Sequence, residues 1–88
     1  MAITKAQALQ RTKRMLKREW VLESEPKAGT SLRNWPDGLG KNDDEIAGLK
    51  RPIETVDFED VKTKVEEEAL TEAETVAGLR DKIWEGTP

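Results

Sequence analysis

The chain has 88 residues, 38% of them charged and 35% hydrophobic, and a formal net charge of −3. It contains no cysteine and no histidine, which excludes disulfides, zinc fingers, thiolate nucleophiles and imidazole bases. No apolar run approaches the ~20 residues that span a bilayer, and residues 1–22 lack the apolar core of a secretory signal. We therefore expect one small domain, residues 1–88, that is cytoplasmic or part of an assembly formed there.

Charge is distributed unevenly along the chain. Residues 1–22 carry six basic side chains and one acidic one, whereas residues 53–88 carry four basic and eleven acidic ones. This polarity favours attraction between the two ends of one chain, head-to-tail association of copies, or a bridge between two partners. Because so small a chain has few large apolar residues, we also expect a partner surface to complete its core. The alternative is a lone helical domain of modest stability.

The first predicted element is a basic amphipathic helix over residues 4–22. Thr4 and Gln7 have the spacing of a capping box, and no glycine or proline occurs before Pro26. Four cations form most of one side of this helix: Arg11, Arg14, Lys17 and Arg18. They are candidate contacts for an acidic protein surface or for nucleic-acid phosphates, and the alternative is a solvated face.

The second predicted element is an irregular arm over residues 23–56, which holds three of the four prolines. Asn42 and Glu45 predict a short helical turn that Pro52 should stop at Arg51, and residues 53–58 could be extended. The arm also contains several large apolar residues, so it either wraps the helices or lies along a partner. The sequence from Trp35 to Gly38 predicts a β-turn, and Trp35 is the best candidate for an exposed binding anchor.

The third predicted element is one long acidic amphipathic helix over residues 57–85. Apolar residues from Phe58 to Trp84 fall within a stripe roughly 140° wide at the helical repeat. Four acids repeat every seven residues on the opposite side: Asp60, Glu67, Glu74 and Asp81. They are candidate contacts for a basic surface, and the alternative is a water-facing side. A capping-box pattern at Thr71 leaves open a break into two helices.

The sequence contains no complete catalytic, nucleotide-binding or metal-binding motif. The Gly38–Lys41 stretch lacks the first glycine and the Ser or Thr of a phosphate-binding loop, and residues 42–45 lack the ligand register of a calcium loop. We therefore expect no enzyme activity, metal, cofactor or small-molecule substrate, and no membrane contact.

The predicted fold class is all-α, with two amphipathic helices, at residues 4–22 and 57–85, joined by the arm. The function we expect is that of a structural or adaptor subunit, in a homo- or hetero-oligomeric assembly such as a viral particle or a multi-subunit machine. Two alternatives remain: a small inhibitor that blocks another protein, and a nucleic-acid accessory protein that uses the basic helix.

Overall fold

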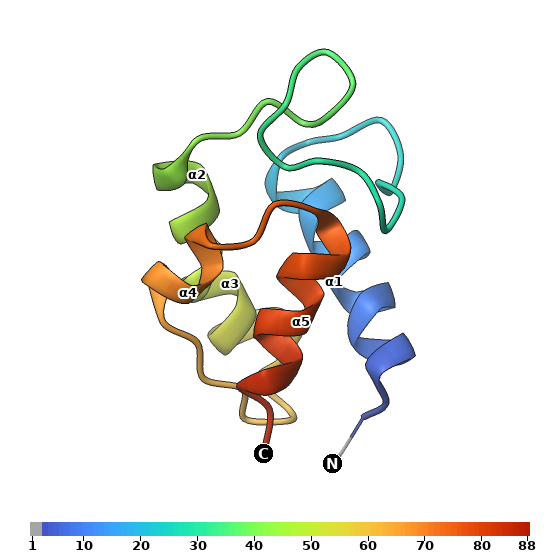
Figure 1. Cartoon of the computed structure of the whole chain (residues 1–88). Coiled ribbons are helices and arrows are strands. Elements are labelled where there is room, and N and C mark those ends of the chain that lie inside the picture. Colours follow the sequence, from blue (N-terminus) through green and yellow to red (C-terminus); the bar gives the residue numbers. More distant parts are fainter. Residues whose placement is uncertain (1–2) are drawn as a thin grey trace.

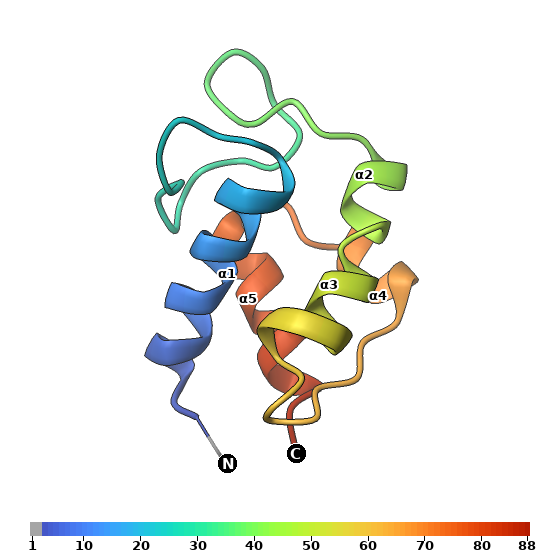
Figure 2. The ribbon, with the colours of Figure 1, turned by 180° about the vertical axis from the view of Figure 1, so that it is seen from behind.

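The computed structural model describes residues 3–88, and within them every regular element is helical. The elements in chain order are α1 (Lys5–Glu19), α2 (Asp43–Ala47), α3 (Lys50–Pro52), the π-helical segment η1 (Ile53–Asp57), α4 (Glu67–Thr71) and α5 (Val76–Glu85). α5 runs through the middle, with α1 on one side and the short helices on the other (Figures 1 and 2). The all-α prediction is confirmed, but the arrangement as two long helices is not.

α1 forms for the local reasons that its sequence predicts. The Gln7 N–H donates to Thr4 Oγ1 at 3.1 Å and the Thr4 N–H donates to Gln7 Oε1 at 2.8 Å, which completes the capping box. The helix ends three residues earlier than predicted, because the Leu22 N–H donates back to the Lys17 carbonyl and Val21 adopts a left-handed φ of 52°. This is a Schellman-type end, with valine where glycine is usual.

α1 and α5 pack antiparallel. Lys5, at the start of α1, lies 3.5 Å from the Asp81 carboxylate, and the Arg80 guanidinium donates to the Lys5 carbonyl at 3.4 Å. The side chains between the two helices form the centre of the core: Ala8, Thr12, Met15 and Leu16 from α1, with Val76, Leu79 and Ile83 from α5.

The arm is more helical than predicted in its second half. The capping box of Asn42 and Glu45 starts α2 as expected, but the chain continues as α3 and η1 to Asp57. The expectations that Pro52 stops the helix and that residues 53–58 are extended are therefore wrong. Leu49 occupies the N-cap position of α3, so Pro52 lies in the first turn of that helix. N–H groups in a first turn have no partner within the helix, so the missing N–H of proline costs no helical hydrogen bond there.

The first half of the arm wraps the helices, which was one of the two expectations for it. The Leu32 N–H donates to the Glu74 carbonyl at 2.8 Å. The carbonyls of Ala28 and Thr30 accept the first N–H groups of α5, from Ala77 and Val76, at 2.8 and 3.0 Å. The arm thereby satisfies a helix N-terminus that would otherwise need water.

The predicted long helix over residues 57–85 is wrong. Residues 58–66 are not helical, and a second break separates α4 from α5. The sequence left open a break at Thr71, and α4 does end there. The next helix, α5, is capped by Thr75 rather than by Thr71, because the Thr75 hydroxyl accepts the Gly78 N–H at 3.0 Å.

Long-range hydrogen bonds explain why the chain near Val65 is extended. Val65 donates its N–H to the Glu54 carboxylate at 2.9 Å, and its carbonyl accepts from Lys50 Nζ at 2.6 Å. Next to it, the Lys64 N–H donates to the Gly86 carbonyl at 3.0 Å. These bonds take up the backbone groups that a helix would use.

The core closes within a single chain. Among residues 3–88, sixteen apolar side chains are buried, none more than 7% exposed, and they include seven members of the predicted stripe: Phe58, Val61, Val65, Ala73, Val76, Leu79 and Ile83. One chain therefore buries a core of its own, and the expectation that a partner surface completes it stays a prediction. Within residues 3–88, no helix is both long and apolar enough to cross a membrane.

Candidate functional site

Two of the four predicted contact cations, Arg11 and Arg18, pair with acids outside α1 and help to hold the fold together. Arg11 forms a bidentate pair with Asp60, at 2.6 and 3.1 Å, and donates to the Asp57 carbonyl at 3.1 Å. Its guanidinium also lies 5.7 Å from the centre of the Phe58 ring. Arg11 therefore ties α1 to the turn that follows η1.

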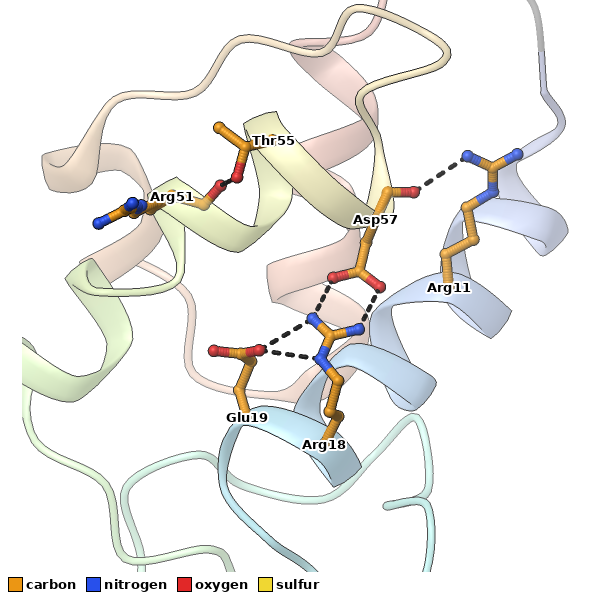
Figure 3. Close-up of polar contacts among 6 residues, drawn as sticks. All are labelled: Arg11, Arg18, Glu19, Arg51, Thr55 and Asp57. Atoms are coloured by element: carbon orange, nitrogen blue, oxygen red, sulfur yellow. Dashed lines mark hydrogen bonds and ion pairs between the residues drawn. The ribbon is translucent and has the colours of Figure 1, made fainter.

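Arg18 makes the second of these links. Its guanidinium bonds both oxygens of the Asp57 carboxylate, at 3.0 and 2.6 Å, and bonds Glu19 at 2.9 Å (Figure 3). The Asp57 side chain is only 9% exposed. Figure 3 also shows the Thr55 hydroxyl of η1 donating to the Arg51 carbonyl of α3, which helps to hold the segment carrying Asp57.

Electrostatics in this cluster favour the charged forms. The hydrogen bond from Arg11 lowers the pKa of Asp60, and the same bond raises the pKa of Arg11. The hydrogen bond to Asp57 likewise raises the pKa of Arg18. The Arg11–Asp60 pair is thus ionised at neutral pH, and the contacts of both arginines serve the fold.

Arg14 and Lys17, the other two predicted cations, point outward. Both are exposed, and neither forms an ion pair within residues 3–88. An open hollow of about 370 Å³ lies along this part of α1, lined by Ala6, Gln7, Gln10, Arg11 and Arg14. The predicted basic row is therefore half structural and half available to a partner.

The four predicted acids do not form one face. Asp60 pairs with Arg11, and Asp81 pairs with Lys5 and Arg80. Glu67 lies at the start of α4 and Glu74 in the loop before α5, and both are exposed. Because the predicted helix is broken, the seven-residue spacing places these acids on four different parts of the fold.

Trp35 is exposed, as the sequence predicts for a binding anchor. The residue is 77% exposed to solvent. The protein has only four aromatic residues, so one of its few large aromatic side chains is left outside the core. It stands in the Trp35 loop, residues 31–41, which rises above the helices at the end of the molecule where α1 finishes (Figure 1). The peptide bond from Trp35 to Pro36 is cis.

The Trp35 loop is held by its own backbone. The Leu39 N–H donates to the Ser31 carbonyl at 2.9 Å, and the Lys41 N–H donates to the Leu32 carbonyl at 2.8 Å. Across the loop, the Gly40 N–H donates to the Asn34 carbonyl at 3.0 Å. These bonds fix the loop on both sides of its tryptophan.

Gly38 shows how tightly the loop is folded. A Cβ at this position would lie 2.5 Å from the Ser31 carbonyl oxygen and 2.6 Å from that of Asn34. Only glycine allows this approach without a shift of backbone, so the loop presents Trp35 in a fixed conformation.

Sequence reasoning missed Val21, which is 87% exposed and has a left-handed φ that a β-branched side chain disfavours. It follows α1, so it lies at the same end of the molecule as the Trp35 loop. The signal available in the sequence was the lack of a glycine after the helix, where the chain must reverse.

Potential metal ligands do not cluster in the part of the chain that the structure describes. Within residues 3–88, no group of three or more acidic side chains is placed to hold a metal ion. The large apolar side chains exposed within residues 3–88 are Trp35, Val21 and Val56, and Arg14 and Lys17 add two outward cations.

Comparisons with known proteins add no functional information. No family model matches the chain, and neither the curated proteins nor the solved structures include a significant match. Function is therefore inferred from the residues and contacts of this chain.

Proposed function

We propose that this protein is a non-enzymatic protein-binding subunit that docks on its partner through the Trp35 loop. The observation that carries the proposal is the 77% exposure of Trp35 on a loop fixed by hydrogen bonds. Tryptophan is enriched among the residues that dominate binding energy at protein interfaces. Within this proposal, the protein is a structural or adaptor component of a larger assembly.

The rigidity of the loop supports this role. A flexible loop loses conformational entropy when it binds, which weakens the complex. The bonds of Leu39, Gly40 and Lys41 to the opposite side of the loop remove most of that loss in advance. A large aromatic side chain held out from such a loop can enter a partner's pocket with little reorganisation.

The position and the exposure of Val21 are a second argument that the contact surface lies at this end of the molecule. Its left-handed backbone costs about 1 kcal/mol that glycine would avoid. Stability is thus given up at a position that exposes an apolar side chain next to the end of α1. A contact role for Val21 accounts for both features together.

The two alternatives have less support. A nucleic-acid role through the basic helix loses strength because Arg11 and Arg18 are engaged with Asp60 and Asp57. An inhibitor that blocks another protein would use the same Trp35 loop, and it differs from a structural subunit only in the effect on the partner.

Photo-crosslinking from position 35 tests the proposal. A photoreactive phenylalanine analogue replaces Trp35 in one variant and Val56 in a second, matched variant. Val56 is 60% exposed but lies in η1, outside the loop. In source cells we expect one discrete adduct from position 35 and none from position 56. Equal labelling of many proteins from both positions would contradict the proposal.

The identified partner then allows a quantitative measurement. By calorimetry, we expect W35A to bind about tenfold or more weakly, because the main aromatic anchor is lost. V56A should bind like the wild type. Thermal unfolding of W35A should be almost unchanged because the side chain contacts little of the core. Unaltered binding by a folded W35A would overturn the assignment of the loop.

A further inference from the structure

We propose that the outer face of α1 binds the acidic edge of α4 in a second copy of this chain. The outer face consists of Gln7, Gln10, Arg14 and Lys17, and the acidic edge of Glu66, Glu67 and Glu68. This contact is separate from the Trp35 loop, so self-association and partner binding can be tested independently.

The outer face has the chemistry of a carboxylate receptor. Its four side chains are exposed and recur at spacings of three and four, which aligns them along one side of the helix. Glu19, the one acidic residue of α1, is bonded to Arg18 and does not neutralise this face.

The hollow on α1 gives a carboxylate a place to bind. Arg14 contributes a guanidinium fork, and Gln7 and Gln10 contribute amide groups. Gln7 uses its oxygen to accept the Thr4 N–H, which leaves its NH₂ group as a donor. Donors of this kind bind carboxylates through charge-assisted hydrogen bonds.

The acidic edge provides matching groups. Glu66, Glu67 and Glu68 are consecutive and exposed, and none forms an ion pair within residues 3–88. The nearby Lys50 bonds Glu54 and the Val65 carbonyl instead. Lys50 attracts Glu66 and Glu67 without forming an ion pair with either, so these glutamates, like Arg14 and Lys17, have no ion-pair contact within residues 3–88.

The two surfaces cannot meet within one chain. α1 and α4 lie on opposite sides of the molecule in both views (Figures 1 and 2). Contact between them therefore joins one copy to the next, head to tail, and the same contact can repeat in a ring or an open chain.

A second copy fits this face better than nucleic acid. The protein has a net charge of −3, and its outer face offers only two free cations from the predicted row of four. Nucleic-acid binding usually needs a broader positive field. A short run of glutamates matches the size and the charge of the face.

Sedimentation velocity of the full chain, over a series of concentrations, tests the contact. At ~20 mM salt we expect wild-type association that increases with concentration, and at ~500 mM salt we expect monomers, because salt screens exposed charges. R14E/K17E and E67K/E68K should each associate about tenfold or more weakly, since like charges then face each other. The milder R14Q/K17Q should change in the same direction.

Mixing the two reversed variants gives the sharper result. In an equimolar mixture of R14E/K17E and E67K/E68K, every contact between unlike copies again joins opposite charges. We therefore expect the mixture to associate when neither variant does so alone. The matched control is K27E/K62E, which changes net charge as much as R14E/K17E but at exposed residues outside both surfaces. It should associate like the wild type.

Several results would overturn the proposal. They are a wild-type chain that stays monomeric at ~20 mM salt, reversed variants that associate like the wild type, or a mixture that stays monomeric while circular dichroism shows folded chains. Equal loss of association in K27E/K62E would show that net charge, rather than this face, controls the effect. DNA or RNA binding that R14E/K17E removes, without self-association, would assign the face to nucleic acid. W35A should associate like the wild type, so failure of the Trp35 proposal would leave this result intact.

Discussion

Residues 5–19 and residues 58–86 each bury one apolar side, but they are held in different ways. α1 is one helix fixed by its own capping box and by ladder bonds between near neighbours. Residues 58–86 change from extended chain to helix twice and depend on partners far away in sequence, such as Glu54 with Val65 and Lys64 with Gly86. Single changes should therefore matter more in the second region than on the surface of the first.

The largest effect should come from Gly86. The Lys64 N–H donates to the Gly86 carbonyl, which brings the two backbone segments close together. A Cβ at position 86 would therefore collide with the Lys64 carbonyl oxygen. We expect G86A to lower the free energy of unfolding by about 3 kcal/mol, the upper end for forced overpacking. Urea denaturation checks this value. A G29A control, with open space around its Cβ, should stay close to wild type, and similar stabilities for both would refute the role of this close approach.

The Glu54 carboxylate should come next. It accepts both the Val65 N–H and the Lys50 ammonium at 2.9 Å, so E54A leaves two polar groups without their partner. We expect a loss of about 2 kcal/mol in the free energy of unfolding. E59A is the matched control, because the Glu59 carboxylate makes no hydrogen bond or ion pair within residues 3–88. An equal effect of the two changes would show that the extended segment does not depend on Glu54.

The same carboxylate should make stability depend on pH. The Val65 N–H, followed by Lys50, lowers the pKa of Glu54 below its ordinary value of 4.5. The unfolded chain therefore binds this proton more readily, so the stabilisation is complete above the ordinary pKa and is lost as the pH falls through the folded pKa. Urea denaturation from neutral pH downward should show this decline, with a shallower slope in E54Q. Equal slopes would contradict the assignment.

Within α1, a cation that forms an ion pair should contribute more to stability than one that does not. R18A removes the bidentate pair to Asp57, and we expect a loss of about 1 kcal/mol, limited by solvent screening of the exposed guanidinium. R14A should leave stability within about 0.5 kcal/mol of wild type because it removes no ion pair. Thermal unfolding of both variants at neutral pH measures the difference. A larger loss in R14A would reverse the division between structural and free cations.

The smallest effect should be a gain at Val21. V21G relieves the left-handed strain at the end of α1, and we expect the free energy of unfolding to rise by somewhat less than 1 kcal/mol. V21A is the comparison, because alanine removes the branched side chain but keeps a Cβ and should gain less. If V21G is less stable than wild type, the valine side chain contributes to the fold and the strain argument fails.

The long-helix prediction failed because one spacing fits two structures. Val61 and Val65 are four residues apart, which places them on one side of a helix and also on one side of an extended strand. Neither regular structure covers both valines, because Val61 and Lys62 lie in a turn with a left-handed φ of 58° at Lys62, and only the chain from the buried Thr63 onward is extended. The N-cap was also misplaced, since Thr71 and Thr75 both offer a side-chain cap and only contact with the arm distinguishes them.

Exposure of a candidate site residue was predictable from the sequence where it depends on neighbouring residues in the chain. Trp35 was identified because a proline-glycine turn tends to reach the surface, and it does. The rows of cations and acids were identified as faces, but Arg11, Arg18 and Asp60 belong to ion pairs that no local pattern could reveal.

The sequence by itself determined the helical class, the caps that start α1 and α2, and the exposed tryptophan, because each depends on residues within one or two turns of one another. Only the tertiary structure decided where the C-terminal half breaks and which charges remain free. Those outcomes depend on hydrogen bonds between segments distant in sequence, and such bonds outweigh the modest preference of a short helix for its own backbone partners.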